Sequence, residues 1–466
     1  MIRVGILSFS DGRKRVHDGL AQYIGETENT LRKILEATAE AQVMTADSAI
    51  WNPELSRTYA NLFLGQGLHA VIFNVQVFAF PNLSAIAANI LTIPILVYCT
   101  REPSLPGLGG MQAAANMIRQ QGGSCTKVWG DCREEKDLKR IMSFLRAARA
   151  ATSLRGQVYG LIGGRSIGMG SGAVNPDLWM AKFGIDVDHI DEAELLRRAD
   201  LVDTGEVERA VTWLTENTRS INYDEKKLVP ESLARQIGTY VATRELVEDR
   251  KLDFAGVKCH YDMSEYQVTQ CLSAAFFNDP YDWNGAKKPF VLSCEADSDG
   301  ALTMQTLKLI AGMPALFIDL RYYDAGQQVL TLCNCGAMST WYASRSEDPA
   351  ENLAEVSLSG IIRKYGGQGA HVHFMAKEGT MTLARLTRVQ NEYMLTAFRG
   401  QCVKFPEEKM KDSAPVWPHA FVKIDFPIEN LLEKFDNNHL HAVHGDWLDE
   451  LEEFCRLKSI EFNGVS

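Results

Sequence analysis

The chain lacks several features that would assign it to a familiar class at once. It has no Cys-x-x-Cys pair among its ten cysteines, and no apolar run approaches the roughly 18 residues of a membrane span. Basic residues are in deficit, with 48 Lys and Arg against 59 Asp and Glu, which gives a net charge of −11. We therefore expect no zinc ribbon, no disulfide framework, no membrane anchor and no nucleic-acid partner.

We expect neither a secretion signal nor a dinucleotide-binding fingerprint. The apolar run in MIRVGILSF is short, and the charged segment Asp-Gly-Arg-Lys follows it closely. No Gly-x-Gly-x-x-Gly motif opens the first expected helix, so we do not predict a nicotinamide or flavin site. Scattered cysteines without a signal predict a cytoplasmic protein with reduced thiols.

What the chain does contain is an alternation of apolar strands and helical patterns. In the first 150 residues, short buried strands such as 70–73 alternate with helical patterns such as 135–151, and a second alternation begins near 157. After about residue 340 this pattern gives way to short strands separated by turns. Because strands that alternate with helices pair in parallel, the pattern predicts α/β architecture.

The predicted fold class is therefore α/β, in three domains. Residues 1–153 and 154–340 would each form a Rossmann-like, doubly wound α/β domain. Residues 341–466 would form a β-rich, barrel-like C-terminal domain.

The segment 289–323 reads as a strand–helix–strand unit. An apolar run at 290–294 ends at Glu295, and a second apolar run at 315–318 ends at Asp319. Between them, residues 297–299 offer N-cap side chains for a helix. A crossover of this length predicts two parallel strands whose carboxyl ends meet at one edge of a sheet.

That geometry would place Glu295 and Asp319 side by side. Two neighbouring carboxylates repel each other unless a cation lies between them, so the pair indicates a metal site. The alternative is two solvated loop acids, which is the common situation for acidic residues.

A third ligand is sought among the histidines, of which the chain has ten. Three of them, His439, His441 and His444, fall within ten residues before an expected helix. Imidazole is a common metal ligand, and one imidazole with two carboxylates leaves open positions for water or substrate. Oxygen-rich coordination favours Mn²⁺ or another divalent cation, whereas histidines packed in a core are the alternative.

Several stretches resemble, in the same order, segments of the L-fucose isomerases and, more distantly, of the L-arabinose isomerases. These stretches are Ser10–Arg13, Gly163–Gly172, Asp282–Gly285 followed by Glu295, Phe317–Arg321, and Asn438–His439 followed by Gly445. The resemblance implies a metal-dependent aldose–ketose isomerase that moves a proton through an enediolate.

The resemblance also implies roles for individual residues. Glu295, Asp319 and His439 would bind Mn²⁺, and Asn438 would lie in the same substrate-binding segment. Glu295 would act as the base and Asp319 as its partner, or with these roles exchanged. In a homo-hexamer with sites shared between subunits, Arg13 would reach into a neighbour's site.

The segment Gly256–His260 departs from the pattern of that family. Lys258 and His260 would suit an anionic substituent, such as a sulfonate or a carboxylate, on a fucose-like or arabinose-like sugar. A surface charge beside a strand is the alternative for Lys258. The glycine-rich run 163–170 and the loop 332–336 are left open between ligand contact and ordinary turns.

Two other function classes stay open at this point. One is a cytoplasmic sugar-binding or sensor protein without catalysis, because a sheet that begins VGILSF also occurs in binding folds. The other is a metal-dependent aldolase or hydrolase that uses the same ligands.

Overall fold

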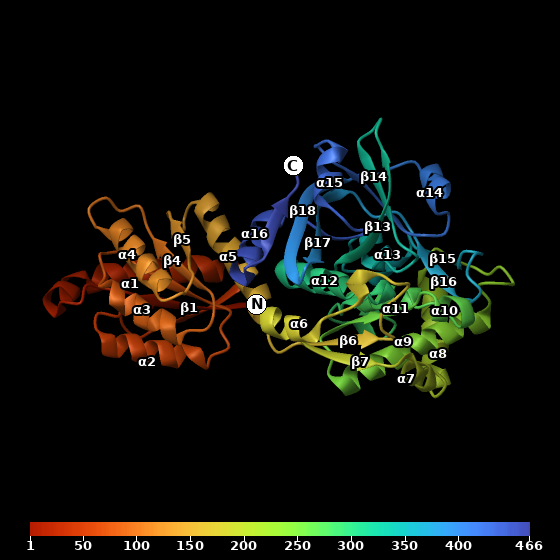
Figure 1. The fold of residues 1–466 in the computed structure, drawn as a ribbon, viewed down its shortest axis with the longest axis horizontal. Helices are drawn as coiled ribbons and strands as arrows, with labels where there is room; N and C mark the ends of the chain where they lie inside the picture. Colours follow the sequence, from red (N-terminus) through yellow and green to blue (C-terminus); the bar gives the residue numbers. More distant parts are fainter. The chain divides into compact units, whose positions relative to one another are not determined.

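The computed structural model describes all 466 residues, which form two compact units (Figure 1). Unit 1 comprises Met1–Ser153 and Asp449–Ser459, and unit 2 comprises Leu154–Leu448 and Ile460–Ser466. None of the helices combines the length and apolar composition that a membrane crossing requires. The division of the chain into three domains stays a prediction.

Unit 1 is a doubly wound parallel sheet, as the alternation predicts. Its strands pair in the order β2-β1-β3-β4-β5. Val4 and Ile6 pack into the core on one face of this sheet, and Leu7 and Phe9 pack on the other. The strands are β1 (Ile2–Ser8), β2 (Ala41–Thr45), β3 (Ala70–Asn74), β4 (Ile95–Cys99) and β5 (Thr126–Trp129). The helices are α1 (Lys14–Ala37), α2 (Pro53–Leu64), α3 (Pro81–Ile90), α4 (Gly107–Gln120), α5 (Glu135–Ser153) and α16 (Leu448–Lys458).

Unit 2 begins with a second parallel sheet, in the order β12-β9-β6-β7. Its strands are β6 (Val158–Ile162), β7 (Asp186–Ile190), β9 (Phe254–Val257) and β12 (Leu292–Ser293). The helices of this part are α6 (Pro176–Phe183), α7 (Glu192–Ala199), α8 (Thr204–Asn217), α9 (Pro230–Arg250), α10 (Asp262–Tyr266), α11 (Cys271–Asn278) and α12 (Ser298–Ala311). The carboxyl ends of these strands form the edge where open α/β sheets carry their ligands.

The rest of unit 2 is rich in antiparallel strands, as expected. A seven-stranded sheet runs β17-β20-β13-β14-β19-β18-β21, and an additional pairing of β17 with β18 closes six of the strands into a barrel-like ring. The strands are β13 (Leu316–Asp324), β14 (Val329–Cys333), β17 (Gly379–Val389), β18 (Glu392–Cys402), β19 (His419–Lys423), β20 (His439–His444) and β21 (Glu461–Gly464).

Smaller elements complete unit 2. A hairpin joins β10 and β11, and a three-stranded sheet runs β16-β15-β8. These strands are β8 (Ser220–Asn222), β10 (Tyr281–Asp282), β11 (Gly285–Ala286), β15 (Ser357–Gly360) and β16 (Ala370–His373). The short helices are η1 (Gly170–Gly172), η2 (Cys294–Ala296), η3 (Thr340–Ala343), α13 (Pro349–Leu353), α14 (Glu408–Ser413) and α15 (Ile428–Lys434).

The prediction of a parallel strand–helix–strand unit over 289–323 is wrong. Strand β12 is only two residues long and pairs in parallel with β9, whereas β13 pairs antiparallel with β14 and β20 in the barrel-like sheet. An apolar run shows that a buried strand exists, but it does not specify the strand's partner. Helix α12 therefore connects two different sheets.

Helix α12 lies between those two sheets, and this explains its composition. Every residue from Ser298 to Leu307 is buried, so the helix has no solvent-facing stripe. Asp297 caps its N-terminus by accepting a hydrogen bond from the Gly300 N–H at 2.9 Å, as the sequence predicts. Gly312 ends it in the left-handed conformation, φ 73°. The helix thereby fixes Glu295, which precedes it, against the strand that follows it.

Candidate metal centre

Asp319 and His439 are placed by the register of two antiparallel strands. Asp319 of β13 lies directly opposite His439 of β20. Directly opposed residues on neighbouring strands project from the same face, so their side chains meet. Asp319 Oδ1 is 3.3 Å from His439 Nε2. The sequence predicts Asp319 at the end of a parallel strand. The structure instead places it within an antiparallel strand of the barrel-like sheet.

Glu295 reaches the same point from the parallel sheet. It follows β12 in the short turn η2, with φ 57° and ψ 19°. A left-handed backbone is unfavourable for a residue with a side chain, and such strain tends to occur at functional sites. Glu295 Oε2 is 3.5 Å from His439 Nε2. The structure therefore brings the three predicted ligands, Glu295, Asp319 and His439, together within unit 2.

The imidazole of His439 is oriented by a buried carboxylate. Its Nδ1 is 2.7 Å from Asp297 Oδ2, and Asp297 also receives two hydrogen bonds from Arg385, at 2.6 and 3.0 Å. Asp297 and Arg385 are both completely buried. The charge of Arg385 and the hydrogen bond from His439 outweigh burial and hold the pKa of Asp297 well below its usual range. Asp297 therefore remains ionised and fixes the ring.

These residues fit a divalent cation. His439 Nε2 is buried and has no hydrogen-bond partner, yet it faces two carboxylates at 3.3 and 3.5 Å. A histidine whose second nitrogen binds a carboxylate is the usual support for a metal-binding imidazole. Two carboxylates with one imidazole suit Mn²⁺ and similar ions.

Without a cation, the same crowding favours the protonated forms. Burial, together with the charges of Cys335 and Asp319, raises the pKa of Glu295 to about 8. Burial alone would lower the pKa of His439, but its hydrogen bond to Asp297 and the charge of Asp319 raise it to about 10. Because Asp297 accepts a hydrogen bond from Nδ1–H, the proton that His439 can release is on Nε2.

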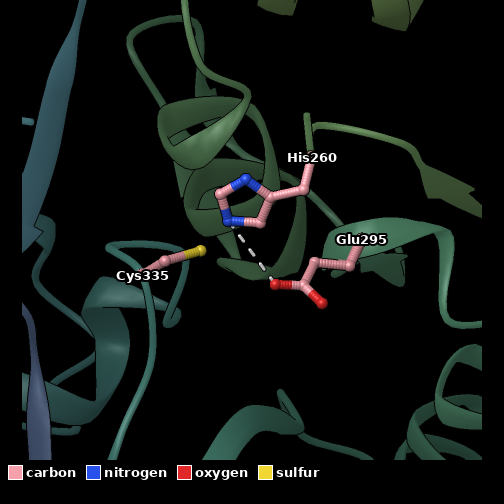
Figure 2. A group of neighbouring side chains, drawn as sticks. All are labelled: His260, Glu295 and Cys335. Atoms are coloured by element: carbon pink, nitrogen blue, oxygen red, sulfur yellow. Dashed lines mark ion pairs between the residues drawn. The ribbon is translucent and has the colours of Figure 1, made fainter. Parts of the chain in front are cut away.

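Glu295 also faces a second group of side chains, on its other side. His260 Nε2 is 3.6 Å from Glu295 Oε1, and Cys335 Sγ lies within 4.8 Å of both groups. Figure 2 shows His260, Glu295 and Cys335 pointing toward one another. Cys335 is 6% exposed, and Cys294 Sγ lies 3.5 Å from its sulfur.

The remaining predicted site residues do not join this cluster. Lys258 follows β9 and pairs with Asp262. Lys258 and Glu192 both line a neighbouring cavity of about 490 Å³. Burial raises the pKa of Glu192 to about 7. Asn438 is exposed, and its carbonyl accepts a hydrogen bond from the Leu320 N–H at 2.8 Å. The substrate-binding roles of Lys258, His260 and Asn438 stay predictions.

Arg13 belongs to unit 1. Its side chain is 68% exposed and pairs with Asp11 at 2.7 Å. Its role in a neighbouring subunit's site stays a prediction.

Sequence reasoning missed the residues that support the candidate ligands. The sequence predicts Asp297 only as a helix cap and gives no role to Arg385, and it leaves the loop 332–336, which contains Cys335, open between ligand contact and an ordinary turn. Asn437, and not Asn438, accepts a hydrogen bond from the His439 N–H, at 2.9 Å. Only the dense acidic segment around Asp297 carried a local signal, because the other contacts join parts of the chain that are far apart in sequence.

Comparison with known proteins agrees with this architecture. Family models match residues 1–156 (L-fucose isomerase, first N-terminal domain), 157–254 (L-fucose isomerase, second N-terminal domain) and 332–465 (L-fucose isomerase, C-terminal domain). His439 lies within the last match, whereas Glu295 and Asp319 lie between the matched segments.

Among curated proteins, the chain is 27% identical over 269 residues to an L-fucose isomerase of Streptococcus pneumoniae strain Hungary19A-6. It is 26% identical over the same length to that of strain CGSP14. Each match covers 51% of this chain and 46% of the relative, so the chain spans about half the length of the curated relatives it matches. A periplasmic solute-binding protein from Actinobacillus succinogenes 130z with bound D-allose covers 67% of this chain and 93% of its own, at 13% identity and a TM-score of 0.18. The three domain matches together establish that the chain belongs to the L-fucose isomerase family.

Proposed function

We propose that the protein is a metal-dependent aldose–ketose isomerase that interconverts an aldose and its 2-ketose through an enediolate. The observation that carries this proposal is the convergence of Glu295, Asp319 and His439 on one point, with His439 Nε2 unpartnered. Membership of the L-fucose isomerase family supports the same chemistry.

Glu295, Asp319 and His439 would hold the cation, which we propose to be Mn²⁺ or another divalent ion. When bound, such a cation supplies Lewis-acid stabilisation of negative charge on the sugar oxygens. Asp297 and Arg385 hold the His439 ring in place, so the site is pre-organised before any ligand arrives.

The two carboxylates are suited to the proton transfers. In our proposal Glu295 removes the C2 proton of the open-chain aldose and returns it to C1, while Asp319 exchanges protons with the hydroxyl groups. The side chain of Glu295 is 14% exposed and that of Asp319 is 27% exposed, so the first is the better shielded from bulk water. That difference favours this assignment over the exchanged one, because a carboxylate shielded from water is the stronger base.

The charges near the site favour a neutral sugar over an anionic one. Lys258 is already paired with Asp262, and the same cavity is lined by Glu192 and Asp191. An anionic substituent placed there would meet more negative than positive charge. We therefore propose a neutral, fucose-like or arabinose-like sugar.

We also propose a homo-hexamer in which Arg13 contributes to a neighbouring subunit's site. The exposure of Arg13, held by Asp11 at the start of α1, supports this arrangement. Light scattering on the purified protein measures the oligomeric state, and a monomer would contradict the proposed hexamer. A cytoplasmic location stays a prediction.

A panel of neutral and anionic aldoses, incubated with the Mn²⁺-loaded protein in D₂O, tests the function. We expect ketose to form from a neutral sugar, with deuterium incorporated at the carbon beside the carbonyl. Carbon–carbon cleavage products would indicate an aldolase instead. Sugar binding without ketose or exchange across the panel would indicate a binding protein and contradict the proposal.

A further inference from the structure

Glu295 presents its two carboxylate oxygens to two different histidines. Oε2 lies 3.5 Å from His439 Nε2, on the side of Asp319, and Oε1 lies 3.6 Å from His260 Nε2. The ligands proposed above use only the first side. The second side contains a nitrogen and a sulfur, and the proposed function assigns neither of them to a cation.

Hydrogen bonds fix which nitrogen of His260 faces that side. His260 Nδ1 lies 3.0 Å from Ser264 Oγ, and Ser264 Oγ donates to the Tyr261 carbonyl at 3.1 Å, an arrangement that suits a proton on Nδ1. In that tautomer Nε2 carries the lone pair, which lies 3.6 Å from Glu295 Oε1 and 2.9 Å from the Tyr365 hydroxyl, so the hydroxyl must turn its proton away when an ion binds. A neutral imidazole that presents a lone pair in this way is in the form that binds metals.

Cys335 completes a set of three ligand atoms of different types. The His260 nitrogen, the Glu295 oxygen and the Cys335 sulfur all lie within 4.8 Å of one another (Figure 2). Bonds of about 2.0–2.3 Å to a tetrahedral ion separate its ligands by about 3.3–3.8 Å, so modest side-chain movement closes the set around one ion. The Cys294 thiol, 3.5 Å from the Cys335 sulfur, is placed to donate a hydrogen bond to a thiolate there.

We propose that His260, Glu295 and Cys335 form a second cation site, selective for soft divalent ions such as Zn²⁺ or Cd²⁺. The ion is bound by the imidazole, the carboxylate and the Cys335 thiolate, any proton still on that sulfur passes to solvent, and a fourth position is left for water. A thiolate and an imidazole disfavour Mn²⁺, which distinguishes this site from the oxygen-rich centre at Asp319 and His439.

Because Glu295 belongs to both sites, occupation of one weakens occupation of the other. Two divalent ions that share a carboxylate repel each other, and each withdraws electron density from the oxygens that bind its neighbour. Coupling of this kind is reciprocal. A soft cation would therefore antagonise Mn²⁺ binding. This consequence rests on the proposed function's metal centre, whereas the existence of the soft site does not.

The test uses the full chain, stripped of metal by a chelator and titrated with Cd²⁺ alone. We expect a thiolate-to-cadmium charge-transfer band in the ultraviolet that saturates near about one equivalent. Cys335→Ser should abolish the band, and Cys125→Ser, which changes a buried thiol of unit 1, should keep it. His260→Gln keeps the sulfur and should weaken Cd²⁺ binding by at least about tenfold.

No band at one equivalent, a band unchanged in Cys335→Ser, or equal affinity in His260→Gln would overturn the proposed ligand set. In a second arm, Cd²⁺ is added to the Mn²⁺-loaded protein, and free Mn²⁺ is followed by electron paramagnetic resonance. Release of Mn²⁺ is expected, and its retention would overturn the antagonism. Neither arm contains a sugar, so failure of the isomerase assay leaves the thiolate result standing, and the reverse also holds.

Discussion

His439 and His260 face the two oxygens of one carboxylate, but the protein supports them differently. His439 is 1% exposed, and its Nδ1 is held by an ionised, buried Asp297 that Arg385 backs in turn. His260 is 12% exposed, and its Nδ1 is held by the neutral hydroxyl of Ser264. Charge-assisted hydrogen bonds are roughly twice as strong as neutral ones. The difference indicates that the His439 side is a rigid, permanent site and the His260 side an adaptable one.

The largest expected effect comes from the residue that both sides share. Glu295→Gln should reduce turnover by about 10²- to 10⁴-fold through loss of the base, and further through loss of Mn²⁺. Asp319→Asn should reduce turnover similarly but should leave Cd²⁺ binding at His260 intact. Steady-state kinetics combined with Cd²⁺ titration measures both, and loss of cadmium binding in Asp319→Asn would remove the distinction between the two sides.

The next effect concerns the support of His439. Asp297→Asn leaves Arg385 charged and buried without its partner, which should lower the free energy of unfolding by about 3–5 kcal/mol. Urea denaturation in the presence of a chelator measures this change without the contribution of a bound cation. Asp188→Asn is the matched control, since Asp188 pairs with Arg250 at the surface, and it should change stability by less than about 1 kcal/mol. Equal effects of the two substitutions would contradict the special role of Asp297.

Mn²⁺ binding at Glu295, Asp319 and His439 should also release protons. In the metal-free protein the pKa of Glu295 is about 8 and that of His439 about 10, so at neutral pH both favour the protonated form. A cation requires both deprotonated, so Mn²⁺ affinity should rise with pH, by up to about tenfold per unit for each proton released, until pH passes these pKa values. Calorimetry in buffers of different ionisation enthalpy counts the protons. An affinity that is independent of pH near neutrality would contradict the arrangement.

The smallest effect is expected on the His260 side. Ser264→Ala removes one neutral hydrogen bond from His260 Nδ1 and should lower the free energy of unfolding by about 1 kcal/mol. It should weaken Cd²⁺ binding only a few-fold, because the ring keeps its other contacts. An effect as large as that of Asp297→Asn would show that the two histidines are supported equally, and the comparison would then fail.

Much of the fold can be predicted from local patterns, because the periodicity of strands and helices depends on residues that are neighbours in the sequence. The helix capped by Asp297 and ended by Gly312 is an example, since both signals lie beside the helix they bound. The pairing of β13 with β20 cannot be predicted in this way, because the two strands are far apart in the sequence. Sequence reasoning placed Glu295 and Asp319 on one parallel sheet edge, whereas they approach each other from two different sheets.

The same limit applies to the candidate site. Acidic residues after apolar runs singled out Glu295 and Asp319, and a dense group of three histidines supplied the candidates from which the family resemblance selected His439. Arg385 could not be selected, and the loop of Cys335 could not be decided, because the importance of both residues depends on contacts made across the fold. Burial turns Asp297 from a helix cap into the support of a ligand, and burial is a property of the assembled protein.

The central claim is that Glu295, Asp319 and His439 bind one divalent cation. Anomalous diffraction at the manganese absorption edge, from crystals of the Mn²⁺-loaded protein, tests it most directly. We predict a single strong peak in unit 2 within bonding distance of one oxygen from each carboxylate and of His439 Nε2. A structure without that peak, or with manganese bound elsewhere and these three side chains free of metal, would contradict it.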